Sequence, residues 1–358
     1  MKFILALIAL ILLSLTVLLV TPSPIEAQAY QPPIAPAMIG AYQPDNQLEN
    51  AELLGKGQIL GPEDVDVDAS GRVYGATADG KIQRIDSNGN IETLTDTGGR
   101  PLGLDWDAQG NLIICDAFKG LLSLSPDGTL TTLLTEVDGQ PLVFTDDLEI
   151  ASDGMIYFSD ASIKFDQKHY VLDMLEARPW GRLIRYDPST QKASTLLSNL
   201  YFANGIALSK NEDFVLINET YRYRITRLWL KGEKAGQSDI FIDNLPGFPD
   251  GVSSSGRGTF WVALATTRNA QADGMHPYPW VKNQIAKLPG FMRPQPAPYG
   301  LIVELDEQGN VIQSLHDQGG DHYSFVTSVQ ERGDFIYLGS LEEDAIAKLP
   351  TPIIQTKN

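Results

Sequence analysis

One short pattern occurs six times in this sequence, and no other feature restricts the fold as strongly. In each occurrence an apolar-polar-apolar strand leads into a tight turn rich in glycine, aspartate or asparagine, and a second strand ends near a small or acidic residue. The six units begin at Glu63, Leu102, Asp146, Asn204, Asp250 and Thr327. Their spacing corresponds to a blade-sized period of about 40 residues, lengthened in places by insertions.

The repeat predicts an all-β fold, a six-bladed β-propeller at residues 55–350. Closing the blades into a ring removes the free sheet edges that a row of such units would otherwise expose. Two insertions interrupt the repeat, at residues 162–181 in the third blade and at residues 268–298 in the fifth. Both contain amphipathic stretches with aromatic residues, so we expect them either to form lids over one face or to cap blade edges. Residues 351–358 form a C-terminal tail.

The chain begins with an apolar segment typical of exported proteins. Residues 3–20 carry no charge, Lys2 precedes them, and Ala27-Gln28-Ala29 has the small-x-small form of a signal-peptidase site. Residues 1–29 are therefore predicted to be a signal peptide or an uncleaved signal anchor, followed by a proline-rich segment at residues 30–54. We expect a propeller that is exported, periplasmic or extracellular, or anchored to a membrane outside the cytoplasm.

The charge balance limits the kinds of partner. The chain has 45 acidic and 27 basic side chains and a formal net charge of −18, which repels the phosphate backbone of nucleic acids. Cations and small neutral molecules fit such a protein better. The single cysteine, Cys115, has no partner in the chain, so no intrachain disulfide is expected.

The first residue of each unit occupies one register, and in four of the six units its side chain carries a carboxylate or amide oxygen. These four residues are Glu63, Asp146, Asn204 and Asp250. The innermost strands of a propeller surround its central channel, so side chains at one register converge on the axis. Carboxylates that converge there repel one another unless a cation lies between them. An all-oxygen set without histidine or cysteine favours a hard ion, Ca²⁺ rather than Mg²⁺.

The next register offers a smaller set of oxygens. Asp64 and Asp147 repeat a carboxylate in the first and third units, whereas three other units have glycine and one has serine. These two aspartates are expected to hold a second ion deeper in the channel.

Several stretches of the repeat resemble the strictosidine synthase-like branch of the calcium-dependent hydrolase propellers. The stretches are GPED from Gly61, FTDDLEIASDGMIYFSDAS from Phe144, FANGIALSKNEDFVL from Phe202, LPGFPDGV from Leu245 and FIYLGSL from Phe335. The wider superfamily includes paraoxonases, regucalcin-type gluconolactonases and diisopropylfluorophosphatase. The resemblance covers roughly the propeller, and it implies a six-bladed fold with calcium in its channel.

The resemblance also implies roles for single residues. It implies a catalytic Ca²⁺ held by Glu63, Asp146, Asn204 and Asp250, and a second, structural Ca²⁺ at Asp64 and Asp147. This chain departs from the pattern at four positions. Asp146 replaces the usual asparagine, and Gly251 replaces a further asparagine ligand of paraoxonases. Leu102 stands where paraoxonases have a channel histidine, and Thr327 stands where the synthases have their catalytic glutamate.

Our first hypothesis is a metal-dependent hydrolase of small esters, lactones or phosphotriesters. Asp250, a ligand with a free oxygen, would act as nucleophile or as base toward water. His322, which precedes the last inner strand, is a further catalytic candidate because it could reach the channel mouth.

Two other functions stay open. One is a non-catalytic propeller with structural calcium, whose face binds a lipid or a protein and whose N-terminal segment associates with a membrane. The other is condensation of the strictosidine synthase type, for which a carboxylate such as Glu304 or Asp321 would have to replace Thr327. A calcium face that opens into a pocket favours the hydrolase, whereas a face filled by the insertions favours the non-catalytic propeller.

Overall fold

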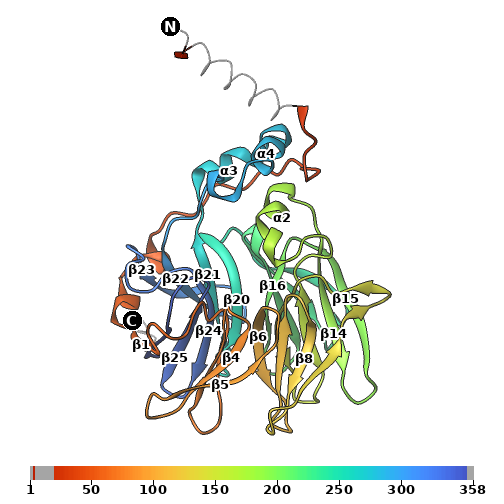
Figure 1. The fold of residues 1–358 in the computed structure, drawn as a ribbon, viewed down its shortest axis with the longest axis vertical. Coiled ribbons are helices and arrows are strands. Elements are labelled where there is room, and N and C mark those ends of the chain that lie inside the picture. The colour runs from red at the N-terminus through yellow and green to blue at the C-terminus, as the bar shows by residue number, and fades with distance from the viewer. Residues whose placement is uncertain (1–2, 5–19, 353–358) are drawn as a thin grey trace.

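The computed structural model describes residues 3–4 and 20–352 and confirms an all-β propeller of six four-stranded antiparallel sheets (Figure 1). The first three sheets contain β2 (Val65–Val67), β3 (Val73–Ala76), β4 (Lys81–Ile85) and β5 (Ile91–Asp96); β6 (Pro101–Trp106), β7 (Leu112–Asp116), β8 (Gly120–Leu124) and β9 (Leu130–Leu134); and β12 (Thr145–Ile150), β13 (Ile156–Asp160), β14 (Gly181–Asp187) and β15 (Lys192–Leu200). The next two contain β16 (Ala203–Leu208), β17 (Phe214–Glu219), β18 (Arg224–Trp229) and β19 (Ser238–Ile242); and β20 (Gly247–Ser254), β21 (Thr259–Thr267), β22 (Gly300–Asp306) and β23 (Val311–Asp317).

The sixth sheet joins the two ends of the propeller. It contains β24 (Val326–Arg332), β25 (Phe335–Ser340), β26 (Ile346–Pro350) and β1 (Glu52–Leu54). Strand β1 pairs with β26 in the register Glu52 to Lys348 and Leu54 to Ile346, so it begins three residues before the expected start of the propeller at residue 55. This pairing closes the ring and covers an edge of the last blade.

Apolar side chains fill the spaces between neighbouring sheets. Trp261, Leu315 and Leu338 are fully buried in one cluster that joins the fifth and sixth blades. Phe158 and Ile184 are fully buried in the cluster that joins the second and third blades. The inner and middle strands therefore form a continuous packed wall around the channel.

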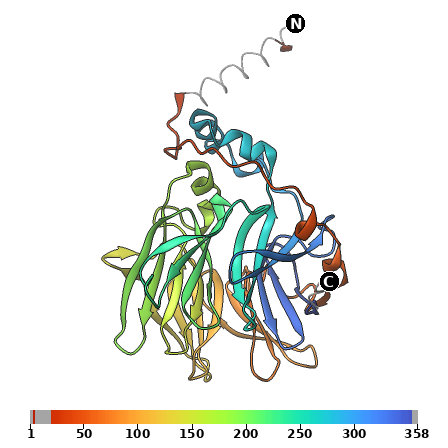
Figure 2. The same ribbon diagram turned by 180° about the vertical axis from the view of Figure 1, so that it is seen from behind.

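The three α-helices and residues 21–30 gather over one end of the propeller, whereas residues 40–50 lie at its side against β23 (Figures 1 and 2). The helices are α2 (Tyr170–Glu176), α3 (Ala270–Met275) and α4 (Pro279–Ala286), with short 3₁₀ turns η1 (Gly40–Tyr42), η2 (Gln47–Asn50), η3 (Gln167–His169), η4 (Thr220–Arg222) and η5 (Gly290–Met292). Helix α2 lies between β13 and β14, and α3 and α4 lie between β21 and β22. Because Thr145 pairs with Asp160 and Gly247 with Thr267, both insertions emerge beside the first residues of inner strands β12 and β20.

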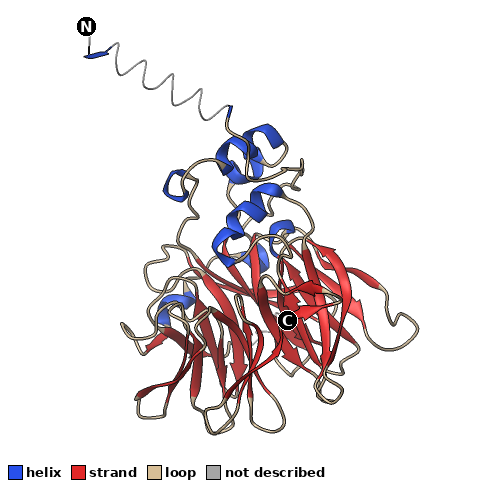
Figure 3. Cartoon of the chain, turned by 45° about the vertical axis from the view of Figure 1, so that its right-hand side comes forward, coloured by secondary structure: helices blue, strands red, loops and turns tan. Residues whose placement is uncertain are grey.

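These insertions and residues 21–30, which we call the strap, form one cap (Figure 3). Its core contains Ile25 of the strap together with Leu175 of α2, Met275 of α3 and Ala286 of α4. Most of the predicted targeting segment, residues 5–19, lies outside the described residues. Within the part of the chain that is described, no helix is long and apolar enough to cross a membrane.

A buried glutamate fixes the strap to the cap. Glu176 is fully buried, and its carboxylate accepts hydrogen bonds from Lys164 Nζ (2.7 Å), Trp180 Nε1 (2.8 Å) and the backbone N–H of Glu26 (2.9 Å). The Glu176 carbonyl accepts a further bond from the backbone N–H of Gln28 (2.8 Å). Residues that the sequence assigned to a signal peptide or an uncleaved signal anchor are therefore bonded into the folded cap.

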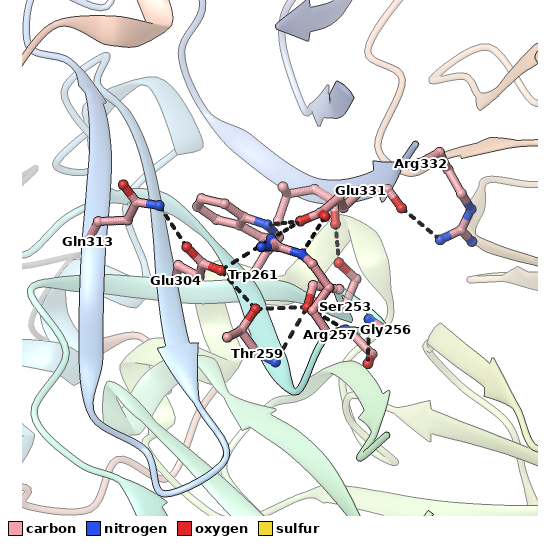
Figure 4. Close-up of polar contacts among 12 residues, drawn as sticks. Ser253, Gly256, Arg257, Thr259, Trp261, Glu304, Gln313, Glu331 and Arg332 are labelled. Atoms are coloured by element: carbon pink, nitrogen blue, oxygen red, sulfur yellow. Dashed lines mark hydrogen bonds and ion pairs between the residues drawn. The ribbon is translucent and has the colours of Figure 1, made fainter. Parts of the chain in front are cut away.

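At the opposite end, a polar network joins the fifth blade to the sixth (Figure 4). Arg257 donates to both carboxylate oxygens of Glu331, at 2.9 and 2.7 Å, and Trp261 Nε1 donates to Glu331 at 2.8 Å. Glu304 is fully buried and accepts from Thr259 (2.8 Å) and Gln313 (2.7 Å). Trp261 is fully buried, so its indole N–H depends on Glu331 for a partner.

We therefore expect Glu331→Gln to lower the free energy of unfolding by about 1–3 kcal/mol, because it weakens the acceptor of a buried indole and turns an amide toward Arg257. Glu136→Gln makes the same chemical change at an exposed position and should shift the free energy by less than about 0.5 kcal/mol. Chemical denaturation of both variants measures the difference. Equal free energies of unfolding for the two variants would show that the network contributes no stability to the contact between the blades.

Candidate functional site

The four oxygen-bearing residues of the first register are all buried at the cap end of the channel. Glu63, Asp146, Asn204 and Asp250 are 7%, 3%, 5% and 7% exposed. Burial, followed by the charges of Asp250 and Asp64, raises the pKa of Glu63 well above its usual value. Burial, followed by the charges of Glu63 and Asp250, does the same to the pKa of Asp146. The carboxyl groups thus influence one another as the register predicts, and we call these four residues the ring.

Asp250 has a distinct environment within the ring. Burial raises its pKa to about 7, while a hydrogen bond from the Asn204 side chain acts to lower it. Its backbone carbonyl accepts a hydrogen bond from Asn218 Nδ2 (2.5 Å). Asp250 therefore titrates close to neutral pH, in a position held by two amide side chains.

The chemistry of the ring fits a hard cation, although its spacing does not form a metal shell. Among the described residues, no hydrogen bond or ion pair reaches the side-chain oxygens of Glu63 or Asp146, despite their burial. Their oxygens are not among the fully buried atoms that lack a partner and so keep some contact with solvent, and a cation or a proton would reduce their repulsion. However, within the described ranges no three His, Cys, Asp or Glu side chains lie close enough to hold a metal ion. The oxygen ligands of the ring are thus of the kind that a calcium site needs, but their spacing in this structure does not form one.

A narrow cavity of about 20 Å³ runs through the channel below the ring. Its walls include Glu63 and Asn204 of the ring, Asp64 and Asp147 of the next register, and Ser328. This volume suffices for one water molecule or ion and excludes an organic substrate. Ser328 Oγ is buried and has no hydrogen-bond partner in the described structure.

Asp64 and Asp147 already have a structural role. Asp64 accepts the backbone N–H of Val65 and, across to the second blade, that of Leu104, both at 2.8 Å. Asp147 accepts the N–H of Leu148 and, across to the fourth blade, that of Ile206, both at 2.8 Å. Each carboxylate therefore links the inner strands of two blades.

A second layer of residues lies two positions before the aligned register of each unit, and in five of the six units these residues stand just ahead of the inner strand. Its members are Gly61, Arg100, Phe144, Phe202, Phe248 and Phe325. Arg100 is 6% exposed, and its guanidinium donates two hydrogen bonds of 3.2 Å to the Gly61 carbonyl. Its charge acts to lower the pKa of Glu63 and of Asp146. We missed this layer in the sequence, although the same alignment contains it two positions earlier.

Two phenylalanines of this layer have strained backbones. Phe202 and Phe325 have φ angles of 60° and 50°, in the left-handed region that bulky residues avoid at a cost of about 1–2 kcal/mol. Phe202 is held by ring contacts with Phe144 (5.2 Å between centroids) and Tyr221 (4.5 Å). Strain of this kind is often found where a fold positions groups for a function.

The cap covers this aromatic layer. Leu102, Phe144, Phe202 and Tyr221 form one buried cluster, against which Met174 of α2 packs. The Tyr221 hydroxyl donates to the Tyr170 carbonyl at 3.0 Å. The insertion of the third blade thus packs over this part of the channel face.

Of the other positions that the sequence singled out, Thr327 lies at the channel and the rest lie away from it. His322 Nε2 contacts the Ala51 carbonyl (2.8 Å) beside the outermost strand of the sixth sheet, away from the channel mouth where we expected it. Thr327 donates to the Glu63 carbonyl (2.5 Å). Glu304 belongs to the network of Figure 4, and Asp321 is exposed.

Comparisons with known proteins identify the family. Two family models match, Strictosidine synthase at residues 146–233 and Strictosidine synthase-like, N-terminal at residues 40–85. The adipocyte plasma membrane-associated protein of Rattus norvegicus is 35% identical over 374 residues, which cover 98% of this chain and 99% of the relative. The chain belongs to the strictosidine synthase-like family. A plant member, Protein STRICTOSIDINE SYNTHASE-LIKE 6 of Arabidopsis thaliana, is 34% identical over 310 residues, covering 84% of this chain and 82% of its own length.

Solved structures place this family member among more distant propellers. A gluconolactonase of Xanthomonas campestris superposes with a TM-score of 0.62 at 18% identity and covers 93% of this chain and 99% of its own. Regucalcin, a calcium-binding protein of Agrobacterium tumefaciens, gives 0.61 at 16% identity and covers 84% and 92%. At these identities the likeness establishes a shared fold.

The raised pKa of Asp250 predicts how the metal-free protein responds to pH. The folded state keeps the Asp250 proton up to about pH 7, whereas an unfolded aspartate releases it near pH 4. This contribution to stability is therefore complete below about pH 4 and is lost as the pH rises toward 7. In excess chelator, the melting temperature should fall between pH 5 and pH 8, and Asp250→Asn should make the fall shallower. A wild-type profile no steeper than that of the variant would contradict the prediction.

Proposed function

We propose that this protein is a calcium-dependent hydrolase of small esters or lactones, with phosphotriesters as a related substrate class. The observation that carries the proposal is the ring, in which the buried Glu63 and Asp146 carboxylates have no donor among the described residues. Ca²⁺ bound there would polarise a carbonyl or phosphoryl oxygen and stabilise the charge that develops on it.

Each ring residue has a role in this proposal. Glu63, Asp146 and Asn204 bind the ion together with Asp250. Asp250 would take a proton from the attacking water through the carboxylate oxygen that does not bind the ion. In the alternative route, the Asp250 carboxylate oxygen would itself attack the substrate as the nucleophile. The Asn204 hydrogen bond keeps the Asp250 carboxylate turned toward the ring.

The second ion remains part of the proposal. Each oxygen of Asp64 and Asp147 accepts one backbone hydrogen bond and keeps a lone pair. An ion below the ring would offset the mutual repulsion of the two aspartates and strengthen the links between blades.

The aromatic layer suggests what the substrate resembles. Phe144, Phe202 and Phe248 would contact an apolar acyl or leaving group, and Arg100 would place a positive charge beside the reacting oxygen. Because Met174 and Tyr221 close this space, α2 has to move before a substrate reaches the ring. The name of the relatives refers to the plasma membrane, which supports a membrane-anchored propeller. Its location outside the cytoplasm is our proposal from the N-terminal segment.

One observation favours a second candidate, a non-catalytic propeller that binds a lipid or a protein. The channel cavity is only about 20 Å³, and side chains of the cap fill the space above the ring. Condensation of the strictosidine synthase type is less compatible with the site, because Thr327 bonds to the Glu63 carbonyl and Glu304 is fully engaged in the polar network of the fifth and sixth blades.

Metal analysis and a substrate screen test the proposal. We expect the purified protein to contain Ca²⁺ and to hydrolyse an aryl ester or a lactone, and we expect a chelator to abolish turnover and lower the melting temperature. A paraoxon screen covers phosphotriesters, and tryptamine with secologanin covers condensation. A calcium-bound protein without turnover would favour the non-catalytic propeller. Condensation that survives chelator would overturn the hydrolase.

Matched variants separate the two proposed ions. Asp250→Asn should reduce turnover at least about a hundredfold with the melting temperature nearly unchanged, because it removes the base and keeps the side-chain shape. Asp64→Asn should mainly lower stability, by about 1–3 kcal/mol, because its amide faces a buried backbone N–H. Loss of the same property in both variants would show that the two sites do not differ in function.

A further inference from the structure

The outer surface of the cap carries large apolar side chains that the protein leaves uncovered. Tyr278 and Trp280, at the start of α4, are 60% and 65% exposed, and Phe291 and Met292 of η5 are 85% and 56% exposed. Single exposed apolar residues are ordinary, whereas four along one short stretch mark an interaction surface. We call these four residues the cap face.

The N-terminal apolar run joins the described structure beside the cap face. In the strap, Ser23 Oγ donates to Asn283 Oδ1 of α4 at 3.0 Å, and the Ala27 N–H donates to the same oxygen at 3.5 Å. Asn283 lies three residues after Trp280, which makes the two side chains neighbours on the helix surface. The run of residues 3–20 therefore leaves the protein at α4.

The connection between the run and the cap is short and stiff. Only Thr21 and Pro22 separate residue 20 from Ser23, a span on the order of 10 Å even when fully extended. Pro22 and Pro24 restrict the backbone further. Ile25, 4% exposed in the cap core, and the bond from Lys282 Nζ to the Gln28 carbonyl then fix the strap. The end of the apolar run is thus held within about 10 Å of the contact between the strap and α4.

The charge of this part of the cap differs from that of the whole chain. No acidic residue occurs between Asp273 and Glu304, whereas Lys282, Lys287 and Arg293 do. The chain as a whole has a net charge of −18, so an anionic surface repels most of the propeller. The cap face belongs to a segment without acidic residues, which an anionic surface does not repel.

We infer that the cap face docks on the lipid bilayer that holds the N-terminal apolar run. Tryptophan and tyrosine prefer the boundary between headgroups and acyl chains, which suits Trp280 and Tyr278. Phe291 and Met292 enter the outer part of the acyl layer, and Lys287 and Arg293 lie near the phosphates. The cap end of the channel consequently faces the membrane. This inference rests on the surface of the cap and is independent of the proposed hydrolase activity.

Site-specific labelling of the full-length protein in vesicles tests the inference. Phe291→Cys and Asn88→Cys each introduce one reactive thiol, because the native Cys115 is fully buried. Both positions are exposed, and Asn88 lies in the turn between β4 and β5, at the opposite end of the propeller. Each variant is labelled with an environment-sensitive fluorophore and reconstituted in phosphatidylcholine vesicles containing phosphatidylglycerol.

We expect the label at position 291 to emit at shorter wavelength, to be quenched by lipids with nitroxides on their acyl chains, and to resist aqueous iodide. The label at position 88 should show the reverse. Equal iodide quenching at both positions would overturn the inference. Protection of position 291 without quenching by nitroxide lipid, lost when the protein is diluted among more vesicles, would assign the face to a second copy of the chain and also overturn it.

Discussion

Side chains have to join the blades around the channel, because neighbouring blades form separate hydrogen-bonded sheets. In the first three blades, aspartates do so: Asp64, Asp105 and Asp147 each accept a backbone N–H of the next blade at 2.8 Å. In the other three blades, the links are an amide and two hydroxyls, from Asn218, Ser253 and Thr327. The fold therefore concentrates negative charge on one side of its axis.

This arrangement also requires the blades to approach closely, which explains the glycines of the second register. A Cβ at Gly205 would lie 2.4 Å from the Asp250 carbonyl oxygen, and one at Gly251 would lie 2.5 Å from that of Thr327. Such contacts cannot relax, because both partners are backbone atoms. Close approach holds the ring carboxyls near one another in a dry environment, and their pKa values rise accordingly. Close packing of the inner strands thus underlies both the stability of the channel and the raised pKa values of the ring carboxyls.

The sequence predicted the features that repeat and missed those that depend on contacts between distant segments. Blade number and the residues of the ring followed from periodicity, because one register places side chains on one axis. Arg100 escaped notice because the alignment began two residues later. The role of Ile25 was hidden, since Ala27-Gln28-Ala29 satisfies a cleavage pattern while the contacts of Ile25 with α2, α3 and α4 lie far away in the chain. The residues next to His322 in the sequence do not show whether its side chain faces the channel or the outer strand of the blade.

The pairing of β1 with β26 has a consequence for how the protein is made. Strand β1 ends at Leu54, before the other strands of the propeller, and its partner ends at Pro350, close to the C-terminus. During synthesis β1 can pair only after β26 has been made, so the growing propeller keeps an open edge until its last strand has left the ribosome. Contacts of such long sequence separation form slowly, and partly made blades expose strands that can pair with other chains. Pairing of β1 with β26 is thus the step that removes the open sheet edge, and a chain without β26 keeps this edge exposed.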